Sequence, residues 1–263
     1  RLVDYHISKT IKLTEFDNST HLLHFKNNCV FNLITMVIEP RIRENYATYT
    51  ANELVSRTDC EDEINSLRTV IESIFPLEET RDDYFRCVIN SFSGRVLERF
   101  FLLNGTGANG KGLISGLLEN LLCSYSYVGL ASIFNSALEG GACPEIAGMN
   151  RKRFCIFRES DESKPLISSV IKTITGDGAI NARLNYSNNT DCRMAGIKMM
   201  EVNKQPIFKG DAGNSMIRRQ VNIEFTEEFS DNPTGNQRQG NNEYKTSEWN
   251  DKHASPLFWI LYD

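Results

Sequence analysis

The spacing of apolar positions divides the chain into a mainly helical first part and a second part in which strands alternate with helices. In the first part, apolar residues recur at helical spacing over about 62–75 and 80–93, and short strands are expected on both sides of a turn at 26–28. The second part alternates between apolar strands and helical segments, expected at 99–104, 111–122, 153–158, 165–174, 198–202 and 220–225. This alternation predicts an α/β fold with a parallel sheet that helices cover.

These patterns predict four segments along the chain. Residues 1–93 are expected to form a small collar domain, mixed but mainly helical, and residues 94–229 the α/β core. The polar, turn-rich stretch at 230–255 is interpreted as a surface loop or a disordered segment. Residues 256–263 are expected to begin a C-terminal helix, and the chain is interpreted as a fragment of a longer protein.

Composition narrows the class of protein. Hydrophobic residues make up 40% of the 263 residues and charged residues 24%, which is an ordinary globular balance. No apolar run approaches the roughly 18 residues that would cross a bilayer, so no membrane association is expected. The seven cysteines lack paired spacing, which argues against a disulfide framework or a zinc ribbon and for a reducing compartment. The net charge of −5 means that any DNA site must be a local patch or a channel shared by several subunits.

The strongest chemical signal is a glycine-rich turn between the expected strand at 99–104 and the expected helix at 111–122. It has the G-x-x-x-x-G-K spacing of a nucleotide P-loop and comprises Gly105, Thr106, Gly107, Ala108, Asn109, Gly110, Lys111 and Gly112. Glycines let backbone N–H groups turn inward around a phosphate, and Lys111 supplies charge for the β- and γ-phosphates. A glycine turn that binds nothing is the weaker interpretation, because the flanking strand and helix are those of a P-loop.

One position departs from the P-loop pattern. Ser or Thr normally follows the lysine and holds Mg²⁺ through its hydroxyl, and Gly112 stands there instead. Ser115, one turn further along the helix, is the alternative hydroxyl. Both an active ATPase and an impaired one therefore stay open.

Acidic residues follow the expected strand at 153–158. A P-loop ATPase needs carboxylates at the end of a neighbouring strand, to hold Mg²⁺ and to activate the attacking water. Glu159 is the leading candidate, with Asp161 and Glu162 as further magnesium ligands and Asp161 also as a catalytic group. Taken alone, the same run is compatible with a solvated acidic loop.

Two other polar elements flank strands. Asn203 ends the expected strand at 198–202 and can orient water near a γ-phosphate, although an isolated Asn there is more often a turn residue. Arg218 and Arg219 precede the expected strand at 220–225. Such a pair can serve as an arginine finger toward a neighbouring subunit or can be a solvated basic pair.

Taken in order and spacing, these motifs resemble those of superfamily 3 helicases, most closely the poxvirus-type primase–helicases of nucleocytoplasmic large DNA viruses. The discriminating parts are Thr175-Gly176-Asp177 with Ala182-Arg183, and Asn203 with Pro206. The resemblance covers about residues 20–229. It implies an AAA+-like P-loop NTPase core that forms a homo-hexamer, binds ATP and Mg²⁺ and unwinds forked or single-stranded DNA.

The resemblance also implies roles and partners. Lys111, Glu159 and Asn203 would act within one subunit, and Arg218 or Arg219 on the adjacent one. A DNA-gripping hairpin would map to about 179–198, where Tyr186 can stack on bases. Lys172, which precedes the hairpin, and Arg183 within it are the candidates that supply charge. The resemblance further implies an upstream primase domain and other viral replication proteins as partners. It also implies a location in the host cytoplasm, at a viral factory.

Three functions are weighed. The leading one is an ATP-dependent DNA helicase for viral genome replication. The second is a P-loop ATPase that acts as a DNA-packaging or protein-remodelling motor, which fork unwinding would separate from the first. The third is a slowly hydrolysing replisome scaffold that nucleotide stabilises, which Gly112 favours.

Overall fold

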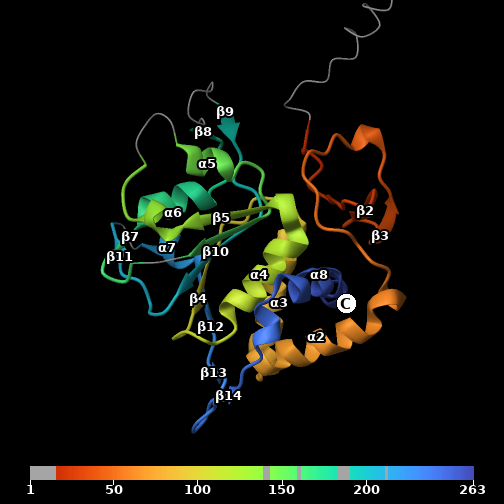
Figure 1. Ribbon diagram of the computed structural model, residues 1–263. Coiled ribbons are helices and arrows are strands. Elements are labelled where there is room, and N and C mark those ends of the chain that lie inside the picture. The colour runs from red at the N-terminus through yellow and green to blue at the C-terminus, as the bar shows by residue number, and fades with distance from the viewer. Residues whose placement is uncertain (1–15, 139–142, 159–160, 183–189, 211–212) are drawn as a thin grey trace, which may run out of the picture.

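A five-stranded parallel sheet lies at the centre of the computed structural model, which describes the chain outside residues 1–15, 139–142, 159–160, 183–189 and 211–212 (Figure 1). The spatial order of its strands is β12-β4-β10-β6-β5. The strands are β4 (Phe100–Asn104), β5 (Ser126–Leu130), β6 (Phe154–Arg158), β10 (Ile197–Val202) and β12 (Gln220–Glu224). Every pairing within it is parallel. The predicted α/β fold with a parallel sheet is therefore confirmed.

The three inner strands are apolar on both faces because helices cover both faces. The first four residues of β4, β6 and β10 are buried in each case. The edge strand β5 is different, since Val128 is 44% and Leu130 60% exposed. Its mixed composition explains why no strand was expected at that place in the sequence.

Alternate residues of each strand pack against different helices. One face of the sheet carries α4 (Lys111–Leu122), which packs against α8 (Ser247–Tyr262), and α8 in turn packs against α2 (Glu61–Ile74). This face contributes Phe101, Leu103, Ile156 and Met199 to the core. The other face carries α5 (Pro144–Gly148), α6 (Ser168–Thr175) and α7 (Asn214–Ile217), and it buries Phe100, Leu102, Phe157 and Met200.

The N-terminal part consists of a small sheet and two helices, as the apolar pattern predicts. The strands β1 (Leu22–His24), β2 (Cys29–Asn32) and β3 (Val37–Pro40) pair in antiparallel fashion, and α2 is followed by α3 (Glu78–Val88). The Phe258 ring of α8 lies 5.3 Å, centroid to centroid, from each of Phe25, Phe31 and Phe92. The expected boundary near residue 93 therefore separates two segments that share one hydrophobic core.

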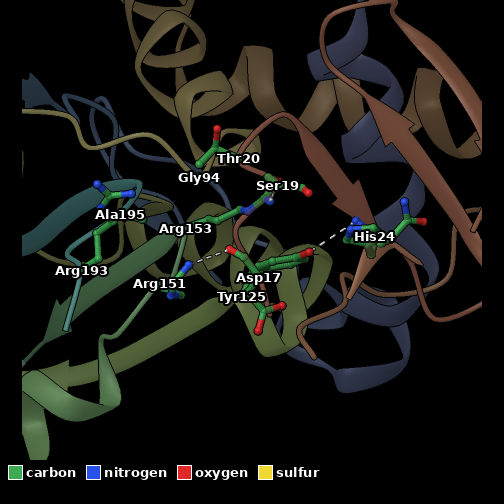
Figure 2. Close-up of a pocket in the computed structure, with 11 residues that line it drawn as sticks. Asp17, Ser19, Thr20, His24, Gly94, Tyr125, Arg151, Arg153, Arg193 and Ala195 are labelled. Carbon is green, nitrogen blue, oxygen red and sulfur yellow. Dashed lines mark hydrogen bonds between the residues drawn. The ribbon is translucent and has the colours of Figure 1, made fainter. Parts of the chain in front are cut away.

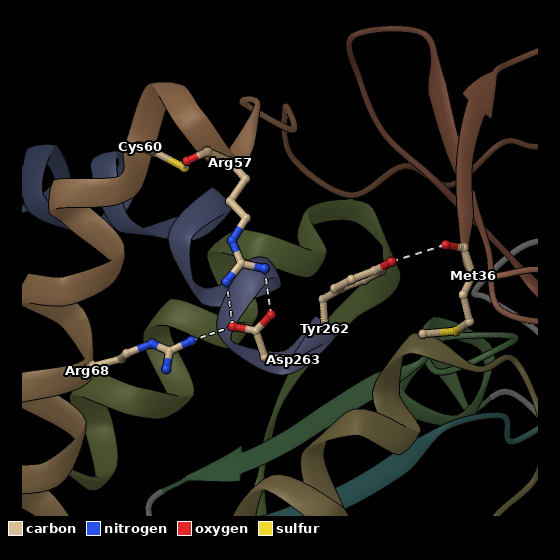
Figure 3. A network of polar contacts seen from close by, with 6 residues as sticks. All are labelled: Met36, Arg57, Cys60, Arg68, Tyr262 and Asp263. Carbon is tan, nitrogen blue, oxygen red and sulfur yellow. Dashed lines mark hydrogen bonds and ion pairs between the residues drawn. The ribbon is translucent and has the colours of Figure 1, made fainter.

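The end of α8 is fixed to the N-terminal part by a polar cluster (Figure 3). Asp263 accepts two hydrogen bonds from Arg57, at 2.6 and 2.8 Å, and also pairs with Arg68 of α2. The neighbouring Tyr262 hydroxyl donates to the carbonyl of Met36 at 3.3 Å. These contacts join helix α8 to α2 and to the turn before β3.

The expectation of a loop or disorder over 230–255 needs correction. This stretch contains β13 (Phe229–Ser230), β14 (Arg238–Gln239), the 3-10 helix η7 (Asn242–Lys245) and the first half of α8. The helix starts at Ser247 rather than at residue 256, with Thr246 as its N-cap, whose hydroxyl accepts from the Trp249 N–H at 3.2 Å. Polar residues on the solvent side of α8, and Pro256 inside it, obscure the helical pattern in the sequence. The helix nevertheless has a buried face that includes Trp249, His253, Leu257 and Leu261.

Smaller elements complete the chain. The strand β7 (Leu166–Ile167) pairs with β11 (Phe208–Lys209), and β8 (Ile180–Ala182) pairs with β9 (Thr190–Cys192) as the two sides of the expected hairpin. Further 3-10 helices are η2 (Arg43–Asn45), η3 (Arg57–Cys60), η4 (Ile89–Phe92), η5 (Cys123–Tyr125) and η6 (Ala131–Phe134). Among the described residues, no helix has the length and apolar character needed to cross a membrane.

Candidate nucleotide-binding site

The P-loop joins the carboxyl end of β4 to the first turn of α4, as the sequence predicts. Its backbone takes left-handed conformations at Gly107, Ala108 and Gly110, with φ values of 92°, 51° and 87°. At Gly110 a Cβ atom would lie 2.7 Å from the side chain of Ile74 in α2. Glycine is therefore required there both by the backbone conformation and by the close approach of α2.

Lys111 points from α4 across the loop toward the end of the central strand β10. Its side chain is 6% exposed, and its ammonium donates to the carbonyl of Val202 at 2.9 Å and to that of Gly105. The Asn203 Oδ1 lies 3.5 Å from the same nitrogen. Burial lowers the pKa of Lys111, and the carboxylate of Glu201 opposes this shift. The structure thus brings together Lys111 and Asn203, which are 92 positions apart in the sequence.

A partly buried carboxylate that the sequence did not single out lies beneath α4. Asn203 directly follows the last residue of β10, whereas Glu201 belongs to the strand and points to its α4 face. Its Oε1 lies 2.5 Å from the Ser115 hydroxyl and 3.4 Å from the Arg158 guanidinium. Arg158 also pairs with Glu119 of α4 at 3.2 Å. The period-two alternation of β10 carried the signal, since an acid on the same face as Ile197 and Met199 needs a partner.

The acidic run after β6 lies partly outside the described residues, because Glu159 is not among them. Asp161 and Glu162 are described and are engaged at the surface, with Lys164 at 3.1 Å and Lys204 at 3.0 Å respectively. Hydrogen bonds from Ser163 and Lys164 lower the pKa of Asp161 to about 2. Within the described part of the chain, Glu201 rather than Asp161 or Glu162 lines the cleft beside Lys111.

The two arginines before β12 differ in their surroundings. Arg219 is 8% exposed in its side chain, pairs with Glu98 at 2.5 Å and donates to the Ser215 carbonyl at 2.9 Å. Arg218 is 59% exposed and lies 3.2 Å from the same carboxylate. Both precede β12, whereas the P-loop follows the parallel strand β4. Both arginines therefore lie at the amino ends of the parallel strands, whereas Lys111 of the same chain lies at the carboxyl ends.

A large cleft opens beside the P-loop, with a volume of about 1210 Å³. Its walls come from α2, the P-loop, the end of β10, and the segment from β13 to the start of α8. Figure 1 shows β13 and β14 at the same end of the molecule as the first turn of α4. Phe229 in β13 donates its N–H to the carbonyl of Ala108 at 2.7 Å, which holds this segment against the P-loop.

A second, much smaller cavity of about 20 Å³ lies near the amino end of β6 (Figure 2). Arg153 donates there to the carbonyls of Phe92 and Leu22, at 2.5 and 2.6 Å, and stacks 4.3 Å from the centre of the Tyr125 ring. Burial, and next the charge of Arg153, lower the pKa of His24 to about 4. The cavity has room for about one water molecule. The hydrogen bonds from Arg153 to the carbonyls of Phe92 and Leu22 join the N-terminal part to the sheet.

Of the three predicted DNA contacts, the structure describes only one. Arg183 and Tyr186 lie outside the described residues. Lys172 is in the last turn of α6 and is half-buried. The predicted DNA contacts stay predictions.

No family model matches the chain. At the level of sequence, the chain is 25% identical over 221 residues to a protein of Acanthamoeba polyphaga mimivirus named "Putative helicase". The match covers 82% of this chain and 23% of the viral protein, so the chain spans about a quarter of that relative.

Solved structures resemble the chain in fold. An apo structure of the C-terminal region of NrS-1 aligns with a TM-score of 0.54 and 13% identity, over 76% of this chain and 45% of that one. Another form of the same region aligns with a TM-score of 0.53 and 11% identity, over 97% of this chain and 57% of that one. A structure of JCV helicase aligns with a TM-score of 0.41 and 16% identity, over 59% of this chain and 44% of that one.

Proposed function

We propose that the chain is the ATPase core of a viral DNA helicase of superfamily 3, which hydrolyses ATP to unwind DNA. The observation that carries the proposal is the meeting of Lys111 and Asn203 at the mouth of a large cleft, at the carboxyl ends of a parallel sheet. Ligands bind at this edge in open α/β sheets. The sequence similarity to a viral protein named as a helicase supports the choice among P-loop functions.

Each residue of the site has a role that its surroundings support. Lys111 would neutralise charge on the β- and γ-phosphates, which the backbone N–H groups of the P-loop and the first turn of α4 would also bind. Asn203 would orient the attacking water, since it lies 3.5 Å from the lysine ammonium. Glu159, which directly follows β6, remains the proposed base for that water.

The oxygen ligands at this site fit a magnesium ion. Glu201 lines the cleft and offers a carboxylate, whose Oε1 contacts the fully buried Ser115 hydroxyl, and Mg²⁺ prefers oxygen ligands together with several waters. Because Gly112 offers no hydroxyl beside Lys111, we propose that Glu201 holds the ion through water. When bound, Mg²⁺ would supply charge neutralisation between the β- and γ-phosphates.

The arginine before β12 completes the site only in an assembly. Arg218 is exposed and lies at the edge of the sheet opposite its own Lys111, so we propose that it acts on the nucleotide of a neighbouring subunit. A homo-hexameric ring on single-stranded or forked DNA is the assembly that the helicase proposal requires. An upstream primase domain and other viral replication proteins are proposed as its partners.

The test is the rate of ATP hydrolysis with and without single-stranded DNA. Lys111→Ala and Arg218→Ala should each abolish DNA-stimulated turnover, and a mixture of the two should restore part of it. The matched control is Arg86→Ala, since Arg86 is a surface arginine that is 75% exposed and far from β12 in the sequence. Turnover in wild type that DNA does not change would overturn the helicase proposal.

Two alternatives predict other results. A DNA-packaging or protein-remodelling motor would hydrolyse ATP without unwinding a fork. A slow scaffold would oligomerise with nucleotide without measurable turnover, and Gly112 is the observation that favours it.

A further inference from the structure

The cleft beside the P-loop extends well beyond the residues that would bind phosphates. Its lining includes Thr69 and Ser73 on α2, and also Tyr244 and Asn250 on the opposite side, none of which belongs to the P-loop. The phosphate-binding groups at 105–112 form only one end of it. The rest of the cleft therefore offers space for a second part of a ligand whose phosphates bind at Lys111.

The floor of this space is the bare side of α4. Gly112 and Gly116 lie four residues apart, on the same side of the helix, and both line the cleft. A Cβ atom at Gly112 would meet nothing within 4 Å, and one at Gly116 would meet only the Asn250 Oδ1 at 3.9 Å. Gly116, one turn beyond the phosphate-binding Gly112, therefore leaves an open surface against which a planar group can lie.

Another part of the cleft lining carries an aromatic ring that packs on its neighbours. Tyr244 is half-buried and lines the cleft, and its ring packs on Trp249 with centroids 4.8 Å apart. Trp249 is itself stacked on His253 with centroids 4.0 Å apart, so three rings pack in succession and Tyr244 is the last of them. The segment before it is held by the Phe229 contact to Ala108 and by a hydrogen bond from Gly240 N–H to Ser230 at 2.8 Å.

We propose that Tyr244 and the glycine floor of α4 form the subsite for the base of a nucleoside triphosphate, with the base stacked on the tyrosine ring. This inference rests on the proposed function, because it needs the phosphates to bind at Lys111. Stacking on an aromatic ring accepts any base, since every base has a π-face. The subsite therefore contributes affinity for the nucleoside and little choice among bases.

The experiment compares ATP with tripolyphosphate, which has the phosphates but no nucleoside. Dissociation constants for both are measured by calorimetry on wild type, Tyr244→Ala, Tyr244→Phe and Gly116→Met. The control is Tyr262→Ala, because Tyr262 is also half-buried and packs on aromatic rings but does not belong to the cleft lining.

The expected result separates the two ligands. Tyr244→Ala weakens ATP binding about 5- to 100-fold, the range that loss of one stacked base gives, and leaves tripolyphosphate binding unchanged. Gly116→Met fills the floor and has the same selective effect, whereas Tyr244→Phe and Tyr262→Ala keep wild-type affinity for ATP. Neither the change at Gly116 nor the change at Tyr262 alters a residue of the proposed phosphate-binding loop at 105–112.

Other results overturn the inference in distinguishable ways. Unchanged ATP affinity in Tyr244→Ala, or equal weakening of ATP and tripolyphosphate, means that the ring does not bind the base, while the proposed function stands. Failure of wild type to bind either ligand overturns the proposed function and this inference together.

Discussion

The missing hydroxyl after the P-loop lysine leads to a prediction that a single substitution can test. Gly112→Ser places a hydroxyl where a P-loop normally has its magnesium ligand. A Cβ atom at Gly112 would meet nothing within 4 Å, so the added side chain meets no steric barrier. Because glycine is a poor helix former, the exchange should leave stability unchanged or raise it by about 0.5 kcal/mol.

The size of the functional effect follows from one added polar contact to a charged group. Such a contact contributes about 1.5 kcal/mol at the low end, which corresponds to roughly a tenfold change in an equilibrium constant. The Mg²⁺ concentration that gives half-maximal ATP hydrolysis should therefore fall about tenfold in Gly112→Ser. Ser115 does not supply this contact already, because its side chain is fully buried and does not line the cleft.

The assay is a Mg²⁺ titration of ATP hydrolysis at saturating ATP, with Gly112→Ala as the matched control. Alanine has the same effect on the backbone and a similar one on the helix but adds no hydroxyl. An equal shift in both variants would assign the effect to the helix rather than to the ion. An unchanged midpoint in Gly112→Ser would refute the argument that position 112 lies next to the metal.

Three further predictions concern stability, measured as the free energy of unfolding in urea. Phe258→Ala should lower it by about 3–5 kcal/mol, because the fully buried ring contacts three other rings of the N-terminal part; a loss below ~1 kcal/mol would contradict the shared core. Glu98→Gln should cost about 1–3 kcal/mol, since it leaves the buried Arg219 guanidinium without its carboxylate; no loss would show that the pair is dispensable. Asp263→Asn should cost less than ~1 kcal/mol at pH 7, because the pair with Arg57 is partly exposed. The hydrogen bond from Arg57 lowers the pKa of Asp263, so this contribution is present above about pH 4 and disappears as pH falls through the lowered pKa; a difference between the two proteins that does not shrink as the pH falls below about 4 would contradict it.

The sequence was sufficient for elements in which local spacing reflects the final environment. The strand before the P-loop, the glycine turn and α4 follow one another within 23 residues, so their order and the place of Lys111 at the start of α4 could be predicted from that stretch alone. The inner strands were predictable because burial on both faces makes them continuously apolar. Asn203 was predictable as a strand end, and the tertiary fold then placed it beside Lys111.

Other parts of the site depend on contacts between segments far apart in the sequence. Glu201 was overlooked because its partners, Ser115 and Arg158, are 86 and 43 positions away. The wall at 229–245 was expected to be a loop because its composition is polar, and its position depends on single contacts such as that of Phe229 with the P-loop. In both cases the local pattern shows polarity but not the partner that explains it.

The two arginines before β12 show how burial separates residues that are equivalent in the sequence. Arg219 is held by Glu98 and by a backbone carbonyl, whereas Arg218 is exposed at the same edge of the sheet. In a parallel sheet this edge lies opposite the P-loop edge, so an Arg218 that acts on nucleotide must act on that of another copy. Such a contact joins two different surfaces and is therefore head-to-tail, and a head-to-tail contact forms a closed ring when its rotation allows closure. The direction of the strands thus supports the proposed ring, given an Arg218 that acts on nucleotide.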